Sequence, residues 1–244
     1  MTTSNPALNE RAFTSAPAGA GTMTVDGTIM KSGMLLAILG LTFAFAWDRA
    51  MRVADPKQVM TYLLVAGISG LVLAMVTIFF KRAAPFTAPA YAAVEGVLLG
   101  VISAYLNAMY PGIALNAALI TFAVFAVMLL AYRARIIQAT EKFKTGVMLA
   151  TGAIMLVYLI GWIMSMFGSG IPYIHEGGII GIGFSLFVIV IAAMNLILNF
   201  DVIEKGAQAG APKYMEWFAA FGLLVTLVWL YIEVLNLLAK LQRR

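Results

Sequence analysis

The sequence contains no cysteine and only one histidine, and 11% of its residues are charged. The missing thiols exclude disulfides, thiol catalysis and thiolate metal sites, and a single histidine excludes a multi-histidine metal site. Soluble domains carry roughly 25% charged residues, so this chain has too little charge to cover a soluble fold. It also lacks the ATP-binding, serine-hydrolase and zinc-protease motifs. We therefore expect neither an enzyme nor a tightly bound cofactor.

Hydrophobic residues make up 62% of the chain, and they gather in stretches close to the roughly 20 residues that span a bilayer. The predicted fold is an all-α membrane protein, a seven-transmembrane-helix bundle formed by residues 31–244. Residues 1–30 are rich in Ser, Thr, Ala, Gly and Pro and are predicted to be a disordered tail. The seven expected spans are 33–48, 59–80, 90–109, 113–132, 145–167, 178–200 and 217–239.

The formal net charge of +5 is interpreted as basic cytoplasmic loops of an inner-membrane protein, and not as a nucleic-acid site. Ten Lys and Arg residues lie on the side of the N-terminus and of the 133–144 loop, against six on the other side. This bias predicts a cytoplasmic N-terminus and, with seven spans, an external C-terminus. The basic C-terminal residues oppose that orientation, and a last helix that only dips into the membrane would remove the conflict.

Acidic side chains are costly to bury in a membrane, and the first candidate is Glu95 in the third span. Gly96 and Gly100 follow it and should let another helix approach closely. The Glu95 carboxylate is either interfacial, near Lys81 and Arg82, or part of a transport path.

Three further carboxylates lie in the last two spans. Asp201 and Glu204 are one helical turn apart at the end of the sixth span, where they either reach water or face the bundle. Glu233 has apolar neighbours and no Lys or Arg within six residues. It either snorkels to the outer surface or faces the interior, where two carboxylates at one site would share a proton. His175 is expected to be a solvated loop residue.

Several short motifs, in order along nearly the whole chain, resemble those of the Bax-inhibitor (transmembrane Bax inhibitor motif) family, and in particular its bacterial subgroup with a longer N-terminal tail. The matching segments are NPAL (5–8), MTVDGT (23–28), EGVLLG (95–100), YPGI (110–113), NFDVIE (199–204), GAPKYMEW (210–217) and WLYIE (229–233).

The resemblance implies a seven-helix fold with the last helix central, surrounded by the other six, and a pH-sensitive calcium leak across the membrane. It implies that Asp201 and Glu233 form an acidic pH sensor that gates the pore and holds calcium transiently. The family has Asp where this chain has Glu233, which puts the pairing geometry in doubt. Lys81 or Arg82 matches the basic residue that can latch onto the carboxylate of the sixth helix.

The predicted spans place Asp201 and Glu233 about 24 Å apart at 1.5 Å per helical residue. They can meet only if the sixth helix continues past Asp201, or if 211–222 lies partly at the membrane surface and the last helix spans 222–242. We adopt this shifted last helix as a hypothesis. A shared proton would then hold the pair together and close the pore at low pH.

Three functions remain open at this point. The first is a cation leak channel in the lipid bilayer with calcium as permeant ion, since calcium prefers carboxylate and carbonyl oxygens. The second is a regulatory protein that binds a membrane protease or another membrane partner. The third is a proton-coupled transporter with Glu95 and Glu233 as its relay.

Overall fold

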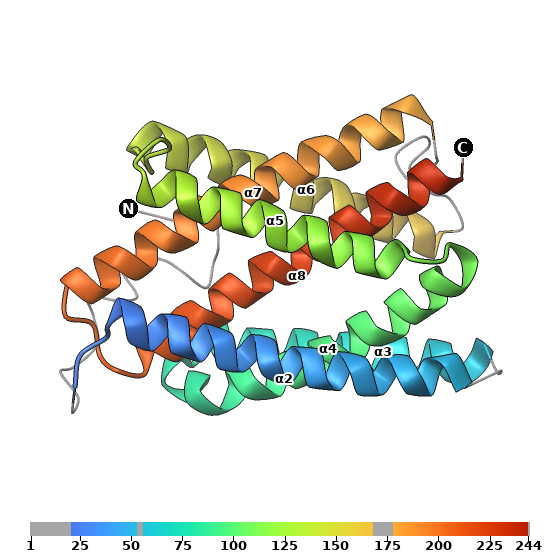
Figure 1. Cartoon of the computed structure of the whole chain (residues 1–244), viewed down its shortest axis with the longest axis horizontal. Helices are drawn as coiled ribbons and strands as arrows, with labels where there is room; N and C mark the ends of the chain where they lie inside the picture. Colours follow the sequence, from blue (N-terminus) through green and yellow to red (C-terminus); the bar gives the residue numbers. More distant parts are fainter. Residues whose placement is uncertain (1–20, 53–55, 168–177, 244) are drawn as a thin grey trace.

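The computed structural model describes residues 21–52, 56–167 and 178–243, and all of its long elements are helices (Figure 1). Seven helices are long and apolar enough to cross a membrane, which confirms the predicted seven-helix bundle and makes the chain a multi-pass membrane protein. They are α2 (Val25–Arg52), α3 (Pro56–Phe79), α4 (Ala84–Met109), α5 (Ile113–Arg133), α6 (Glu141–Met166), α7 (Ile179–Gln208) and α8 (Met215–Gln242), with a 3₁₀ turn η1 (Lys81–Ala83) before α4.

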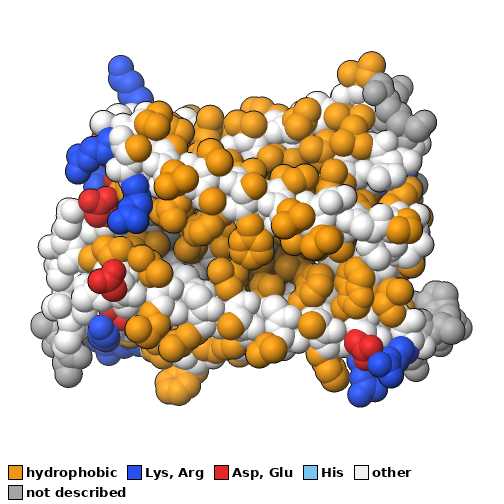
Figure 2. Space-filling view, in the orientation of Figure 1, with side chains coloured by type: hydrophobic (Ala, Val, Ile, Leu, Met, Phe, Trp, Pro, Cys, Tyr) orange, Lys and Arg blue, Asp and Glu red, His pale blue; other side chains and the backbone are white. Residues whose placement is uncertain are grey.

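The charged side chains gather at the two ends of the bundle, and hydrophobic side chains cover the face between them (Figure 2). We call one end the α7–α8 end, because the turn 209–214 lies there together with the start of α2 and the α5–α6 connection. The opposite end holds the α4–α5 turn and the end of α8. Glycines with positive φ make both turns possible, Gly112 at 86° and Gly210 at 66°.

The last helix is the most buried of the seven, with 83% of its apolar stretch buried against 17–44% for the others. It packs against α2, α4, α5 and α7. Its largest fully buried side chains include Phe218, Phe221 and Leu224. The outer helices instead expose large apolar side chains, as expected for surfaces that face lipid.

The close approach predicted at Gly96 and Gly100 is confirmed. A Cβ atom at Gly96 would collide with the Leu39 carbonyl and with Thr42 of α2, and one at Gly100 would collide with the Phe43 carbonyl. The missing side chains therefore let the backbones of α2 and α4 touch.

The predicted disordered tail extends too far, because α2 begins at Val25 and residues 21–24 are bound to the fold. The Met23 amide donates to the Ala211 carbonyl at 2.6 Å, and the Met23 side chain is buried. Thr22 forms an isolated bridge with Pro212. The tail boundary at residue 30 is thus wrong. Residues 1–20 and the loop residue His175 lie outside the described residues.

The shifted last helix is also wrong. α7 does continue past Asp201, to Gln208. However, α8 runs without a break from Met215, and Met215, Phe218 and Ala219 are completely buried. The segment 211–222 is therefore mostly core, because the apolar residues that follow Lys213 pack inward against α2 and α4.

Candidate functional site

Helices α7 and α8 form an antiparallel pair with a constant register. The Asn199 amide of α7 donates to the Thr226 hydroxyl at 2.7 Å, and Lys240 of α8 donates to the Ser185 hydroxyl at 2.8 Å. Fourteen residues separate the two contact points on each helix. Each residue of α7 can therefore be paired with the residue of α8 that lies at the same level along the axis of the bundle.

Asp201 lies near the α7–α8 end in a group of charges. Lys144 of α6 and Lys205 of α7 approach its Oδ2 atom at 3.0 and 2.9 Å. The Lys144 side chain is only 3% exposed, and it also pairs with Glu141 at 3.4 Å. These ion pairs connect the start of α6 with the last turns of α7.

The other predicted site residues near this end have different partners. Glu204 accepts a hydrogen bond from the Tyr132 hydroxyl of α5. The ammonium group of Lys81 lies over the Phe218 ring at 5.7 Å, and Arg82 is exposed. The basic partners that the structure gives to Asp201 are thus Lys144 and Lys205, and not the predicted latch residues.

Glu233 is buried in the other half of α8, with 3% of the residue exposed. The Tyr158 hydroxyl of α6 donates to its Oε1 atom at 2.6 Å. The Glu233 side chain therefore faces the interior of the bundle and does not snorkel to the surface.

A polar cavity of about 240 Å³ borders Glu233. It is formed at the opposite end of the bundle by α4, α6, α7 and α8. Lys240 lies along the same cavity, where its ammonium donates to the Gly181 carbonyl at 3.1 Å and to Ser185. The cavity lining is Leu106, Tyr158, Phe184, Glu233, Asn236, Ala239, Lys240 and Arg243.

The structure does not bring Asp201 and Glu233 together. Asp201 lies two residues beyond Asn199 towards the α7–α8 end, and Glu233 lies seven residues beyond Thr226 in the other direction. Nine residues of helix correspond to about 13 Å along the bundle. Each carboxylate also has its own partners, so the predicted shared proton and the joint calcium site have no geometric basis in this state.

A third buried carboxylate, Glu216, was not predicted as a site. It begins α8 and is completely buried. Its Oε1 atom accepts hydrogen bonds from the Thr24 amide at 2.9 Å and the Thr24 hydroxyl at 3.0 Å, and Lys213 lies 2.9 Å away. Lys31 of α2 pairs with the second oxygen. The sequence did contain a signal for this site. Thr24 and Glu216 belong to two of the motifs that carry the resemblance, 23–28 and 210–217, and these motifs contact each other here.

Glu95 is buried between α3 and α4. Tyr91 lies one turn earlier on the same helix, and the Glu95 Oε1 atom lies against Gly70 of α3, which leaves room for it. Neither of the proposed neighbours Lys81 and Arg82 is needed to explain its burial. Glu95 and Glu233 therefore occupy separate sites on different helices.

A family model described as Bax inhibitor 1 like matches residues 5–243 of the chain. Neither a search of curated proteins nor a search of solved structures finds a match.

Proposed function

The chain belongs to the Bax inhibitor 1-like family, and on this premise we propose that it is a pH-sensitive calcium leak channel of an inner membrane, with its N-terminus in the cytoplasm. The observation that supports this best is Glu233, a buried carboxylate that borders a polar cavity. Burying a carboxylate within a membrane costs several kcal/mol, and a cation that passes this point would repay part of that cost.

The ion path follows the α7–α8 pair. Calcium enters the cavity at the opposite end and is held by the carboxylate of Glu233, the strongest oxygen ligand on the lining. The ammonium of Lys240 lies on the same lining and competes with the cation for the carboxylate. Such a tethered competitor keeps the flux small, as a leak requires.

The gate lies at the other end of the same helix pair. The ion pairs of Asp201 with Lys144 and Lys205 hold α6 against α7, and Tyr132 with Glu204 ties α5 to the same turn. In this arrangement the α7–α8 end is closed. Opening requires α6 to move away from α7 at this level.

This gate responds to pH with a definite sign. The ion pairs depend on the negative charge of Asp201, so loss of this charge breaks them and favours the open state. Leak should therefore increase as the pH falls on the side of the α7–α8 end. This reverses the sign expected from a proton shared with Glu233, because that expectation required the two carboxylates to touch.

Calcium flux into liposomes containing the purified protein tests the path. We expect Glu233→Gln to lose most of the flux and Lys240→Met to increase it. Glu95→Gln is the matched control, since Glu95 is also buried but lies on α4 and does not line the cavity. Equal flux with and without protein, or an unchanged flux in Glu233→Gln, would overturn the proposal.

The pH profile of the same flux tests the gate. We expect Asp201→Asn to give a high flux that no longer depends on pH, because the neutral amide cannot form the ion pairs. Glu204→Gln, one turn further along α7, should keep the pH response. An Asp201→Asn protein with the wild-type profile would show that the gate lies elsewhere.

A further inference from the structure

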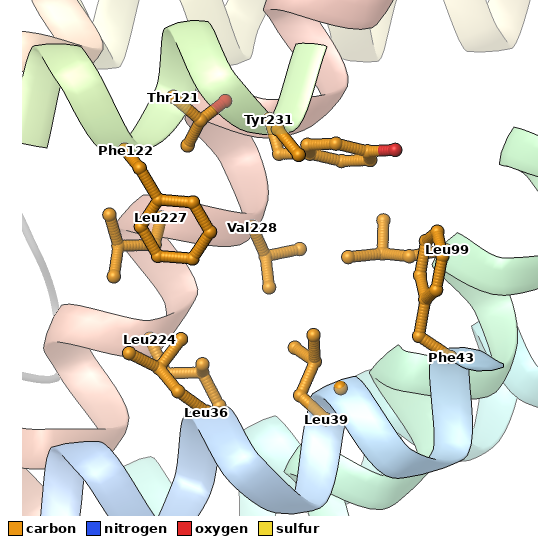
Figure 3. A pocket seen from close by; sticks show the side chains of 12 residues that line it. Leu36, Leu39, Phe43, Leu99, Thr121, Phe122, Leu224, Leu227, Val228 and Tyr231 are labelled. Carbon is orange, nitrogen blue, oxygen red and sulfur yellow. The ribbon is translucent and has the colours of Figure 1, made fainter. Parts of the chain in front are cut away.

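A second cavity, of about 200 Å³, lies halfway along the bundle and is apolar throughout. Figure 3 shows its walls: Leu36, Leu39 and Phe43 come from α2, Thr121 and Phe122 from α5, and Leu224, Leu227, Val228 and Tyr231 from α8. Leu99 of α4, Gly40 and Ala118 complete the lining. We call this cavity the α2–α5 groove, because these two helices form its two rims.

The groove offers a ligand almost no polar groups. Its only hydroxyls belong to Thr121, which donates to the Ala117 carbonyl at 2.8 Å, and Tyr231, which is paired with Ser103 at 2.7 Å. Water needs several polar partners to occupy a cavity, and here it would find at most the oxygens of these two hydroxyls. The groove therefore suits hydrocarbon and excludes water.

The groove is continuous with the surface that faces lipid. Figure 2 shows it as a hollow in the middle of this face, with hydrophobic side chains on its floor and rims. Phe122 on one rim is 55% exposed, and the neighbouring Leu41 and Leu119 are 74% and 59% exposed. The lining residues also lie near the midpoints of α2, α5 and α8, far from the charged ends.

We propose that the α2–α5 groove binds an acyl chain of a membrane phospholipid. At this depth the groove borders the hydrocarbon region of the bilayer, so acyl chains are the molecules that reach it. Filling it restores the dispersion contacts that the lining side chains lack across the gap. The inference is independent of any ion flux through the α7–α8 pair.

Two glycines of α2 provide a test. A Cβ atom at Gly40 would meet no atom within 4 Å, so Gly40→Leu fits the protein while its side chain occupies the groove. Gly33 lies two turns earlier on the same helix and is equally open, but it does not line the groove. Gly33→Leu is therefore the matched control, and Ala118→Leu fills the groove from the other rim.

The experiment uses the full chain in vesicles of phosphatidylcholine that carries a diazirine in the middle of one acyl chain. After illumination, labelled peptides are mapped by mass spectrometry. Leu227 and Val228 of α8 are only 5% and 7% exposed, so adducts there require a chain inside the groove. Leu41 and Leu119 report contact with bulk lipid.

We expect adducts at Leu227 or Val228 in the wild type and in Gly33→Leu, and their loss in Gly40→Leu and Ala118→Leu. Labelling at Leu41 and Leu119 should persist in all four proteins, and a thermal unfolding midpoint close to that of the wild type shows that the variants are folded. Absence of adducts on α8 in the wild type, or adducts that survive both groove-filling changes, would overturn the proposal. An adduct with the mass of a free fatty acid would also overturn it.

Discussion

Glu216 and Glu233 are both buried on α8, 17 residues apart, yet their surroundings are opposite. Glu216 is saturated by two lysines and two groups of Thr24, and it joins the start of the chain to the last helix. Glu233 accepts a hydrogen bond from the neutral Tyr158 hydroxyl, and it shares the lining of a polar cavity with the ammonium of Lys240. A buried carboxylate with complete ionic pairing supports the fold, whereas one beside a cavity has capacity left for a ligand.

The largest effect on stability is expected for Glu216→Gln. This change leaves Lys31 and Lys213 without their anion, and breaking a buried ion pair costs about 3 kcal/mol. For a chain of this size that lowers Tm by about 10 °C. Thermal unfolding of the purified protein in detergent measures it. If Glu233→Gln lowered Tm by as much, the distinction between the two carboxylates would fail.

A smaller effect is expected for Tyr158→Phe, which removes the hydroxyl donor to Glu233. The loss of one hydrogen bond costs about 1 kcal/mol, but the freed carboxylate oxygen can now bind a cation, so calcium flux should rise. Tyr105→Phe is the control, because Tyr105 is 60% exposed and lies towards the same end of the bundle. A large loss of stability without any change in flux would make Glu233 a structural residue like Glu216.

The smallest effect is expected for Lys213→Met. The Lys213 side chain is 51% exposed, whereas that of Lys31 is 15% exposed, although both pair with Glu216. Exposed ion pairs contribute less than about 1 kcal/mol, so Lys31→Met should lower Tm more than Lys213→Met. A larger decrease in Tm for Lys213→Met than for Lys31→Met would mean that Glu216 is stabilised mainly by the lysine of the α7–α8 turn and not by the lysine of α2.

Hydropathy and glycine spacing were sufficient to predict the helices and one of their contacts. The seven apolar stretches became seven helices, and Gly96 and Gly100 showed where α4 meets a neighbour. These features are local, because span length and helical spacing depend on residues within a few turns of each other.

The partners of the carboxylates could not be predicted in this way. Lys144 is 57 residues from Asp201 and Tyr158 is 75 residues from Glu233, so only the packing of α6 brings them close. Glu216 lies in the segment 211–222 that was expected partly at the membrane surface, although its side chain turns inward to meet Thr24. Which residues form such pairs depends on how the helices are aligned along one another, and a single sequence does not give this alignment.

The bond between Thr24 and Glu216 joins residues 192 positions apart, so the segment before α2 meets this partner only after α8 has been synthesised. Until α8 is inserted, Asn199 lacks Thr226 and Ser103 lacks Tyr231. Contacts between such distant residues form late in folding. The spanning helices α2 to α7 therefore lack these hydrogen bonds until α8 joins them, and α8 supplies the contacts that complete the bundle.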